Sequence, residues 1–360
     1  MKKFVLVILA AALAAGGIMM LENSGTPTAA AGNAYTGTLL VAGMGGHFTK
    51  ADVSIDPSAE NPIKLESLDR IVIGDKTTHP THDPRVDVND KNIMYWSTYK
   101  LDPNGKLHVG KSEIKSGKKL EDKAIDLDAR AKWTGALYCG SGQSKKFFMP
   151  VTMTDEAYID VFDKKTLELK HRVFLDKEGY TPGKTKFYHG VNSPDLKTFA
   201  VSINMADDGK PNGKIDMLLL DMAALEKGKA KVLAKNTITG TPGKTLTFRQ
   251  SFTPDGKYLL QSGGDRMFLL DGKTLALIDE EMLDIGENHD VISTPDGKYG
   301  LLTLRNKVKD GDKEVTDGSV VLYDIGSKKL TGGMTSVCMS CHNKVGITGN
   351  AVLCGADAVW

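Results

Sequence analysis

The sequence predicts an all-β fold, and three observations lead to that class. Apolar runs of about four to six residues are separated by Gly, Asp, Asn and Pro, as expected for short strands joined by tight turns. A phrase that contains a Pro-Asp-type turn recurs along the chain. Each copy has room for four strands, and radial repetition of four-stranded sheets is the architecture of a β-propeller. We therefore predict a β-propeller.

The repeats predict six blades. The clearest copy runs from Phe248 to Glu281 and contains a Pro-Asp-Gly hairpin turn. Related copies contain the segments YHGVNSPDLKTFAVSI and HDVISTPDGKYGLLTL, and weaker copies contain DVNDKNIMYWSTY, SGQSKKFFMPVTM and TGTLLVAGM. Six copies favour a six-bladed ring, with seven blades as the alternative.

These SPDGK-type units resemble those of the YVTN-type propellers. They also resemble the propeller domain that binds d-type haem in periplasmic nitrite reductases. The resemblance extends over most of the chain after its N-terminal segment, but the shared motifs are short. It therefore implies a fold and not an activity.

The N-terminus is typical of an exported protein. Lys2 and Lys3 precede an apolar stretch from Phe4 to Leu21. This arrangement indicates a signal peptide, which we place at residues 1–31. The stretch is also near the shortest length that spans a bilayer, so an uncleaved anchor is the alternative. We expect a bacterial protein in the periplasm, outside the cell or on its surface, in contact with a membrane only if this segment is retained.

The propeller is expected over residues 36–333, followed by a tail over residues 334–360. The first repeat lacks an inner strand, because Thr38–Val41 aligns with the second strand of the other copies. The tail segment Asn350–Asp357 resembles Gly135–Gly142, which aligns with an inner strand. We therefore expect the tail to supply the missing strand and close the ring.

The tail carries the run Cys338-Met339-Ser340-Cys341-His342, which is the attachment pattern of c-type haem. Two thiols spaced by two residues can each bond to one porphyrin, and the adjacent imidazole can reach its iron. The alternatives are a zinc half-site, which would need a second pair of ligands, a thioredoxin-like pair and a plain disulfide. For an exported chain the motif favours one covalent haem c on Cys338 and Cys341, with His342 as the proximal iron ligand.

The sixth iron ligand is less constrained. No Met or His follows His342, and Met334 and Met339 are tethered too close to the motif to reach the iron. The ligand must come from the propeller or another polypeptide, or be absent. Four candidates are expected on the face of the ring where the tail emerges: His47, His82, His189 and His289. Each could instead be a hydrogen-bonding group that lines the channel.

Three further residues are candidates for roles near the haem. Arg249 aligns with His189 and could pair with a haem propionate, or form a structural salt bridge in the channel. Cys139 and Cys354 are the two cysteines that are not used by the haem motif. An even number of remaining cysteines in a protein outside the cytoplasm suggests a disulfide. If both lie on inner strands of non-adjacent blades, however, they are too far apart to bond. Both outcomes stay open.

The composition and the Cys-Met-Ser-Cys-His motif together limit the classes of function that we expect. The chain has 46 Lys and Arg against 45 Asp and Glu, without long blocks of one sign, so no nucleic-acid partner is expected. The motif predicts one-electron transfer with a redox partner protein, with the haem docked on a propeller face. One alternative is a periplasmic oxidoreductase with a second cofactor, d-type haem or a metal, in the His-lined channel. Another is a haem-linked structural or filament subunit, and enzyme status and oligomeric state stay open.

Overall fold

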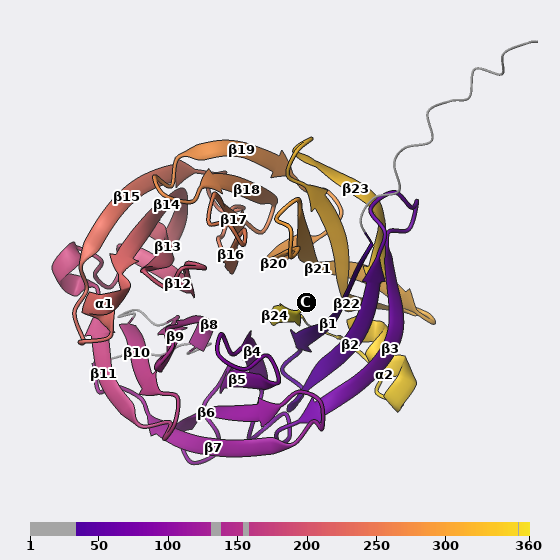
Figure 1. Cartoon of the computed structure of the whole chain (residues 1–360), viewed down its shortest axis with the longest axis horizontal. Helices are drawn as coiled ribbons and strands as arrows, with labels where there is room; N and C mark the ends of the chain where they lie inside the picture. The colour runs from indigo at the N-terminus through magenta and orange to yellow at the C-terminus, as the bar shows by residue number, and fades with distance from the viewer. Residues whose placement is uncertain (1–33, 131–137, 154–157, 352) are drawn as a thin grey trace, which may run out of the picture. The chain divides into compact units, whose positions relative to one another are not determined.

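The chain forms a ring of six four-stranded antiparallel sheets around a central axis (Figure 1). This computed structural model describes residues 34–130, 138–153, 158–351 and 353–360, and the predicted signal peptide at residues 1–31 lies outside them. Among the described residues no helix is long and apolar enough to cross a membrane. The prediction of an all-β propeller is confirmed, with six blades rather than seven.

The blades follow one another along the chain, and the second to sixth blades each begin with the strand nearest the axis. From the axis outward, the first blade contains β24 (Gly355–Val359), β1 (Tyr35–Ala42), β2 (His47–Ile55) and β3 (Ile63–Val72). The second contains β4 (Thr81–Val86), β5 (Ile93–Thr98), β6 (Lys106–Glu113) and β7 (Lys119–Asp126). The third contains β8 (Tyr138–Gln143), β9 (Phe147–Thr152), β10 (Tyr158–Asp163) and β11 (Leu169–Phe174).

The second half of the ring repeats this plan. The fourth blade contains β12 (Thr185–Asn192), β13 (Thr198–Asp207), β14 (Lys210–Asp221) and β15 (Val232–Thr239). The fifth contains β16 (Gln250–Phe252), β17 (Tyr258–Ser262), β18 (Arg266–Asp271) and β19 (Leu277–Met282). The sixth contains β20 (Glu287–Ser293), β21 (Tyr299–Asp310), β22 (Lys313–Asp324) and β23 (Lys329–Ser336). The described helices are η1 (Asp176–Glu178), α1 (Met222–Leu225) and α2 (Cys338–Val345).

In the fourth, fifth and sixth blades the recurring Pro-Asp turn explains why the two innermost strands form a hairpin. In the fifth blade Asp255 accepts hydrogen bonds from the Thr253 hydroxyl at 2.7 Å and from the Lys257 amide at 3.0 Å. Gly256 has a φ of 68°, a left-handed conformation that glycine adopts without strain, and Gly297 repeats it in the sixth blade. The turn residues of the repeats thus fix the step from the innermost strand to the next.

The tail strand β24 supplies the innermost strand of the first blade. It pairs antiparallel with β1, so a strand from one end of the described chain completes a sheet from the other end. Side chains of two Asp residues also hold it in the ring. Asp290 Oδ2 accepts from the Ala356 amide at 2.8 Å, and Asp357 Oδ2 accepts from the Val86 amide at 2.7 Å. The closing strand is therefore bonded to its own blade and to the second and sixth blades.

The closing strand begins at Gly355, later than the resembling segment Asn350–Asp357 suggested. Close packing at the axis explains the glycine. A Cβ added to Gly355 would lie 2.5 Å from the His82 carbonyl oxygen and 2.7 Å from Arg249 Cζ. The chain can turn into the innermost strand at this point only because the position has no side chain.

An apolar cluster between the sixth and first blades positions the tail. It contains strand residues of both blades, such as Leu39 and Leu322, together with Val337, Cys338 and Leu353 of the tail. These tail side chains are almost completely buried. Removing this apolar surface from water stabilises the docked position of the tail.

Candidate functional site

The helix α2 carries the run predicted to attach haem, and it lies in the chain between the last strand of the sixth blade and the closing strand. Cys338 and Cys341 are three positions apart, so they lie on neighbouring positions of one helix face. The helix ends at Gly346, which has a φ of 71° and whose amide donates to the His342 carbonyl. At its start the Met339 amide donates to Asp317 Oδ1 at 2.9 Å, which ties the helix to β22.

Both sulfur atoms of the motif are buried. Cys338 is 5% exposed and Cys341 is 1% exposed, and neither forms a disulfide. Cys338 Sγ lies 2.4 Å from the position that a Cβ of Gly318 would take, so only a glycine in β22 allows this approach. Burial raises the pKa of the Cys338 thiol well above its ordinary value. In the docked tail Cys338 is therefore held as an unreactive thiol.

His47 and His342 border the same small cavity, which has a volume of about 10 Å³. His342 reaches it from α2 and His47 from the first position of β2. Burial lowers the pKa of both imidazoles, which favours the neutral form that binds a metal. His342 Nδ1 is buried and has no hydrogen-bond partner among the described residues. The sequence-predicted proximal ligand and one of the four distal candidates are thus brought together.

The types of side chain at this site fit a covalent haem. The space between α2 and β2 is too small to hold one. Two thiols on one helix and two imidazoles that border one cavity are the groups that would bind the porphyrin and its iron. A cavity of about 10 Å³ does not admit a porphyrin between His47 and His342. Cys341 borders a separate hollow of about 440 Å³. The charged residues of its lining are Lys50, Asp52, Asp69, Arg70 and Lys344. A haem bonded to both sulfurs would need α2 to lie farther from β2.

The other three candidate histidines lie around the axis, in what we call the central cluster: His82, His189, His289, Arg249, Asp83, Asp290 and Cys139. The three imidazoles are at most 2% exposed, and burial lowers the pKa of each well below its ordinary value. They come from the innermost strands β4, β12 and β20. His189 is the fifth residue of its strand.

Each of these imidazoles has a partner within the protein on one ring nitrogen, whereas His189 Nδ1 has none among the described residues. His82 Nδ1 contacts the Tyr138 carbonyl oxygen and lies 3.2 Å from Arg249 Nη2. His189 Nε2 lies 2.8 Å from Cys139 Sγ. His289 stacks on Phe248, with ring centroids 4.3 Å apart, and its Nδ1 lies 3.3 Å from Arg249 Nη1. The described contacts are those of hydrogen-bonding groups at the axis, and none of the three borders the cavity at His342.

Arg249 forms the salt bridge that was the alternative to a propionate contact. Its Nε lies 3.0 Å from Asp83 Oδ1 and 3.8 Å from Asp290 Oδ2. With Nη1 and Nη2 facing His289 and His82, each guanidinium nitrogen has a partner in the central cluster. The propionate contact stays a prediction that these contacts do not favour.

Cys139 and Cys354 have separate partners. Cys139 lies on the innermost strand β8 and its sulfur faces His189. Cys354 directly precedes β24, and its Sγ lies 3.3 Å from Arg305 Nη2. Burial raises the pKa of the Cys139 thiol to about 12 and also raises that of Cys354. Both thiols are free and buried in this structure.

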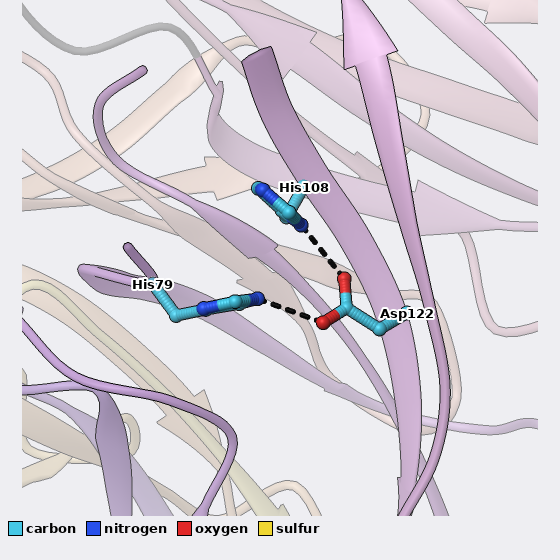
Figure 2. A group of neighbouring side chains, drawn as sticks. All are labelled: His79, His108 and Asp122. Atoms are coloured by element: carbon cyan, nitrogen blue, oxygen red, sulfur yellow. Dashed lines mark hydrogen bonds and ion pairs between the residues drawn. The ribbon is translucent and has the colours of Figure 1, made fainter. Parts of the chain in front are cut away.

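One group of potential metal ligands was not expected from the sequence. We call it the loop-blade cluster, and it consists of His79, His108 and Asp122 (Figure 2). The residues lie far apart in the chain and form no spaced motif. Only the pairing of β6 with β7, and the packing of the preceding loop on them, brings them together. A sequence signal would have required the strand register.

Comparisons with known proteins support the fold. A chain in a nidogen/laminin complex matches with a TM-score of 0.56 and 14% identity, over 90% of this chain and 98% of that one. A chain of hydrazine synthase from Kuenenia stuttgartiensis matches with a TM-score of 0.47 and 15% identity, over 79% and 76%. No protein-family model and no curated protein sequence matches this chain. The fold places the protein among the β-propellers, and these similarities do not extend to a YVTN-type or d-haem family.

Proposed function

We propose that this protein is an exported monohaem c-type cytochrome that transfers single electrons to or from a partner protein. The haem would be bonded to Cys338 and Cys341, with His342 and His47 as the two iron ligands. The observation that carries the proposal is the attachment motif on α2, whose His342 borders one cavity with a second imidazole. Haem supplies a one-electron iron couple, and the protein tunes it through ligands, burial and hydrogen bonds.

His47 is preferred as the sixth ligand because of its partners. Its Nδ1 lies 3.2 Å from the Gly45 carbonyl oxygen, which orients the ring by one nitrogen and leaves Nε2 for a metal. The histidines of the central cluster are engaged with Arg249 or Cys139 instead. Met339 is packed in the apolar cluster, which removes it as a ligand.

Haem attachment must precede docking of the tail. A thioether forms from a reachable thiol, whereas both sulfurs are buried once α2 lies on the propeller. A porphyrin held by Cys338, Cys341, His342 and His47 would keep α2 farther from β2 than it lies here. The attached haem would therefore lie between the helix and the first blade, where Lys50, Arg70 and Lys344 can meet its carboxylates.

A haem stain and a difference spectrum test the proposal. The protein is produced with and without a host system for cytochrome maturation, denatured, and stained for covalent haem. The expected result is one haem per chain and a single c-type reduced-minus-oxidised spectrum, found only with maturation. A polypeptide of unmodified mass without a Soret band would contradict the proposal.

The order of attachment has its own test. Folded apoprotein and apoprotein unfolded in denaturant are each given reduced haem together with a maturation system. We expect covalent product only when the tail is accessible, because of the buried sulfurs. Equal yields from both forms would show that the docked tail does not protect them.

A second cofactor at the axis is not favoured by the packing. The backbone of Gly355 lies against His82 and Arg249 so closely that even a Cβ would clash. Space at this level of the axis is therefore filled by protein atoms. One iron per purified chain, together with a purely c-type spectrum, would exclude d-type haem at the axis.

A further inference from the structure

The loop-blade cluster lies outside every residue assigned to the haem (Figure 2). His79 lies in the loop between β3 and β4, His108 on β6 and Asp122 on β7. We propose that this cluster binds one divalent transition-metal ion, with Zn²⁺ as the best match, and so joins the loop between the first two blades to the outer strands of the second. The inference does not depend on the haem.

Distances within the cluster are close to those of a metal site. His79 Nε2 lies 2.7 Å from Asp122 Oδ2, and His108 Nδ1 lies 2.8 Å from Asp122 Oδ1. One potential ligand atom from each residue lies within 4.8 Å of the other two. Ligand atoms around a tetrahedral Zn²⁺ are roughly 3.3 Å apart, given metal–ligand distances of about 2.0–2.1 Å. Displacements of about 1 Å would therefore place all three around one ion.

The ligand types select the metal. Two imidazoles and one carboxylate suit Zn²⁺ and its neighbours Cu²⁺ and Ni²⁺, whereas Ca²⁺ and Mg²⁺ prefer oxygen ligands. Three protein ligands leave a fourth position for water. The side chains of His79 and His108 are 12% and 13% exposed, so an ion can enter from solvent.

Each imidazole is also held by its second nitrogen, as metal-binding histidines are. His79 Nδ1 lies 2.9 Å from the Thr78 hydroxyl, and His108 Nε2 lies 3.4 Å from Asp102 Oδ2. The loop is shaped around one ring, because a Cβ on Gly74 would lie 2.3 Å from His79 Nδ1. These contacts fix which nitrogens face Asp122 before any ion arrives.

Lys119 competes with the ion. Its ammonium nitrogen lies 2.8 Å from Asp122 Oδ2 and 2.8 Å from the Ile73 carbonyl oxygen. A bound cation would repel this charge, and the side chain, which is 35% exposed, can turn to solvent. Removing the ammonium should therefore strengthen metal binding, whereas removing a ligand should weaken it.

The test compares variants of the full mature protein without an affinity tag. Metal is removed with a chelator, and Zn²⁺ binding is measured by calorimetry and by metal analysis after dialysis. Wild type is expected to bind one Zn²⁺ at this cluster. His79→Gln and Asp122→Asn should each weaken binding by a hundredfold or more, Asp102→Asn by about tenfold, and Lys119→Met should strengthen it. The matched control is His171→Gln, at an exposed histidine on β11, which should bind as wild type does.

Lys119→Met is expected to bind Zn²⁺ more tightly than wild type. Misfolding cannot produce that result, because an unfolded variant would lose the site. Circular dichroism of the metal-free variants checks that each is folded. The proposal is overturned if wild type takes up no Zn²⁺ at millimolar concentration. It is also overturned if His79→Gln and Asp122→Asn bind as wild type does, or if His171→Gln loses as much affinity as they do.

Discussion

Two groups of histidines in this protein differ in their burial and in the partners that surround them. His82, His189 and His289 are fully buried around the axis, and Arg249, Cys139 or a backbone carbonyl faces each of them. His47 and His342 are only partly buried and border a shared cavity. All four propeller histidines were expected on the same face. The partners of a side chain, rather than its place on a face, decide whether it is available to a ligand.

The largest expected effect concerns the thiols of the tail. Replacing Cys338 and Cys341 together with Ser should abolish covalent haem, because a hydroxyl forms no thioether. Denatured protein should then give no haem stain and no bound Soret absorption. The control Cys139→Ser changes a buried thiol of the central cluster and should keep full staining. Staining that survives in the double variant would place the attachment elsewhere.

The second expected effect separates the two histidine groups by spectrum. His47→Ala should convert low-spin iron into a high-spin form that binds carbon monoxide, since the sixth ligand is lost. His289→Asn is the matched control, and it should destabilise the fold by about 1–3 kcal/mol without changing the spectrum. The assignment of His47 is wrong if only His289→Asn changes the spin state.

The third expected effect distinguishes the two roles considered for Arg249. Arg249→Lys keeps the charge but loses the fork that reaches Asp83, His82 and His289. We expect the free energy of unfolding to fall by about 1–3 kcal/mol in urea titrations, with an unchanged redox potential. A shifted potential with unchanged stability would instead support a propionate contact.

The smallest expected effect is a change in pH dependence. Burial lowers the pKa of His289 well below 6.5, so below pH 6.5 the unfolded chain takes up a proton that the folded protein excludes. The contribution of His289 to stability is thus complete above pH 6.5 and is lost as pH falls. His289→Asn should reduce the slope of stability against pH below 6.5 by about 1.4 kcal/mol per unit.

Urea unfolding of both proteins between pH 5.5 and 7.5 measures this difference. Burial raises the pKa of the neighbouring Asp290 to about 7, which gives the opposite slope. Asp290 is present in both proteins, so its contribution cancels in the comparison. Identical slopes would mean that His289 can take up a proton within the fold.

Local patterns predicted the parts of the molecule that local chemistry determines. Pro-Asp-Gly turns identified the hairpins, and the number of repeats gave the number of blades. The short likeness between the tail and Gly135–Gly142 pointed to a strand from the tail. Its start at Gly355 could not be predicted, because it depends on the approach of Arg249 across the ring.

Long-range packing determines the features that the sequence left open or did not indicate. The loop-blade cluster requires the pairing of two strands and the fold of a separate loop. The salt bridge of Arg249 joins the fifth blade to the second and sixth. No fixed sequence spacing marks such contacts. The sequence shows only the residue types that could form them.

The pairing of β1 with β24 also has a kinetic consequence. Thr38 is paired with Val359, so closing this sheet requires the encounter of segments at nearly the greatest separation along the described chain. Loop-closure entropy makes such contacts slow to form relative to local hairpins. The other five blades can fold from neighbouring strands while the segment between β23 and β24 is still unconstrained. Under the proposed function, the time before this sheet closes is when Cys338 and Cys341 would be reachable for haem attachment.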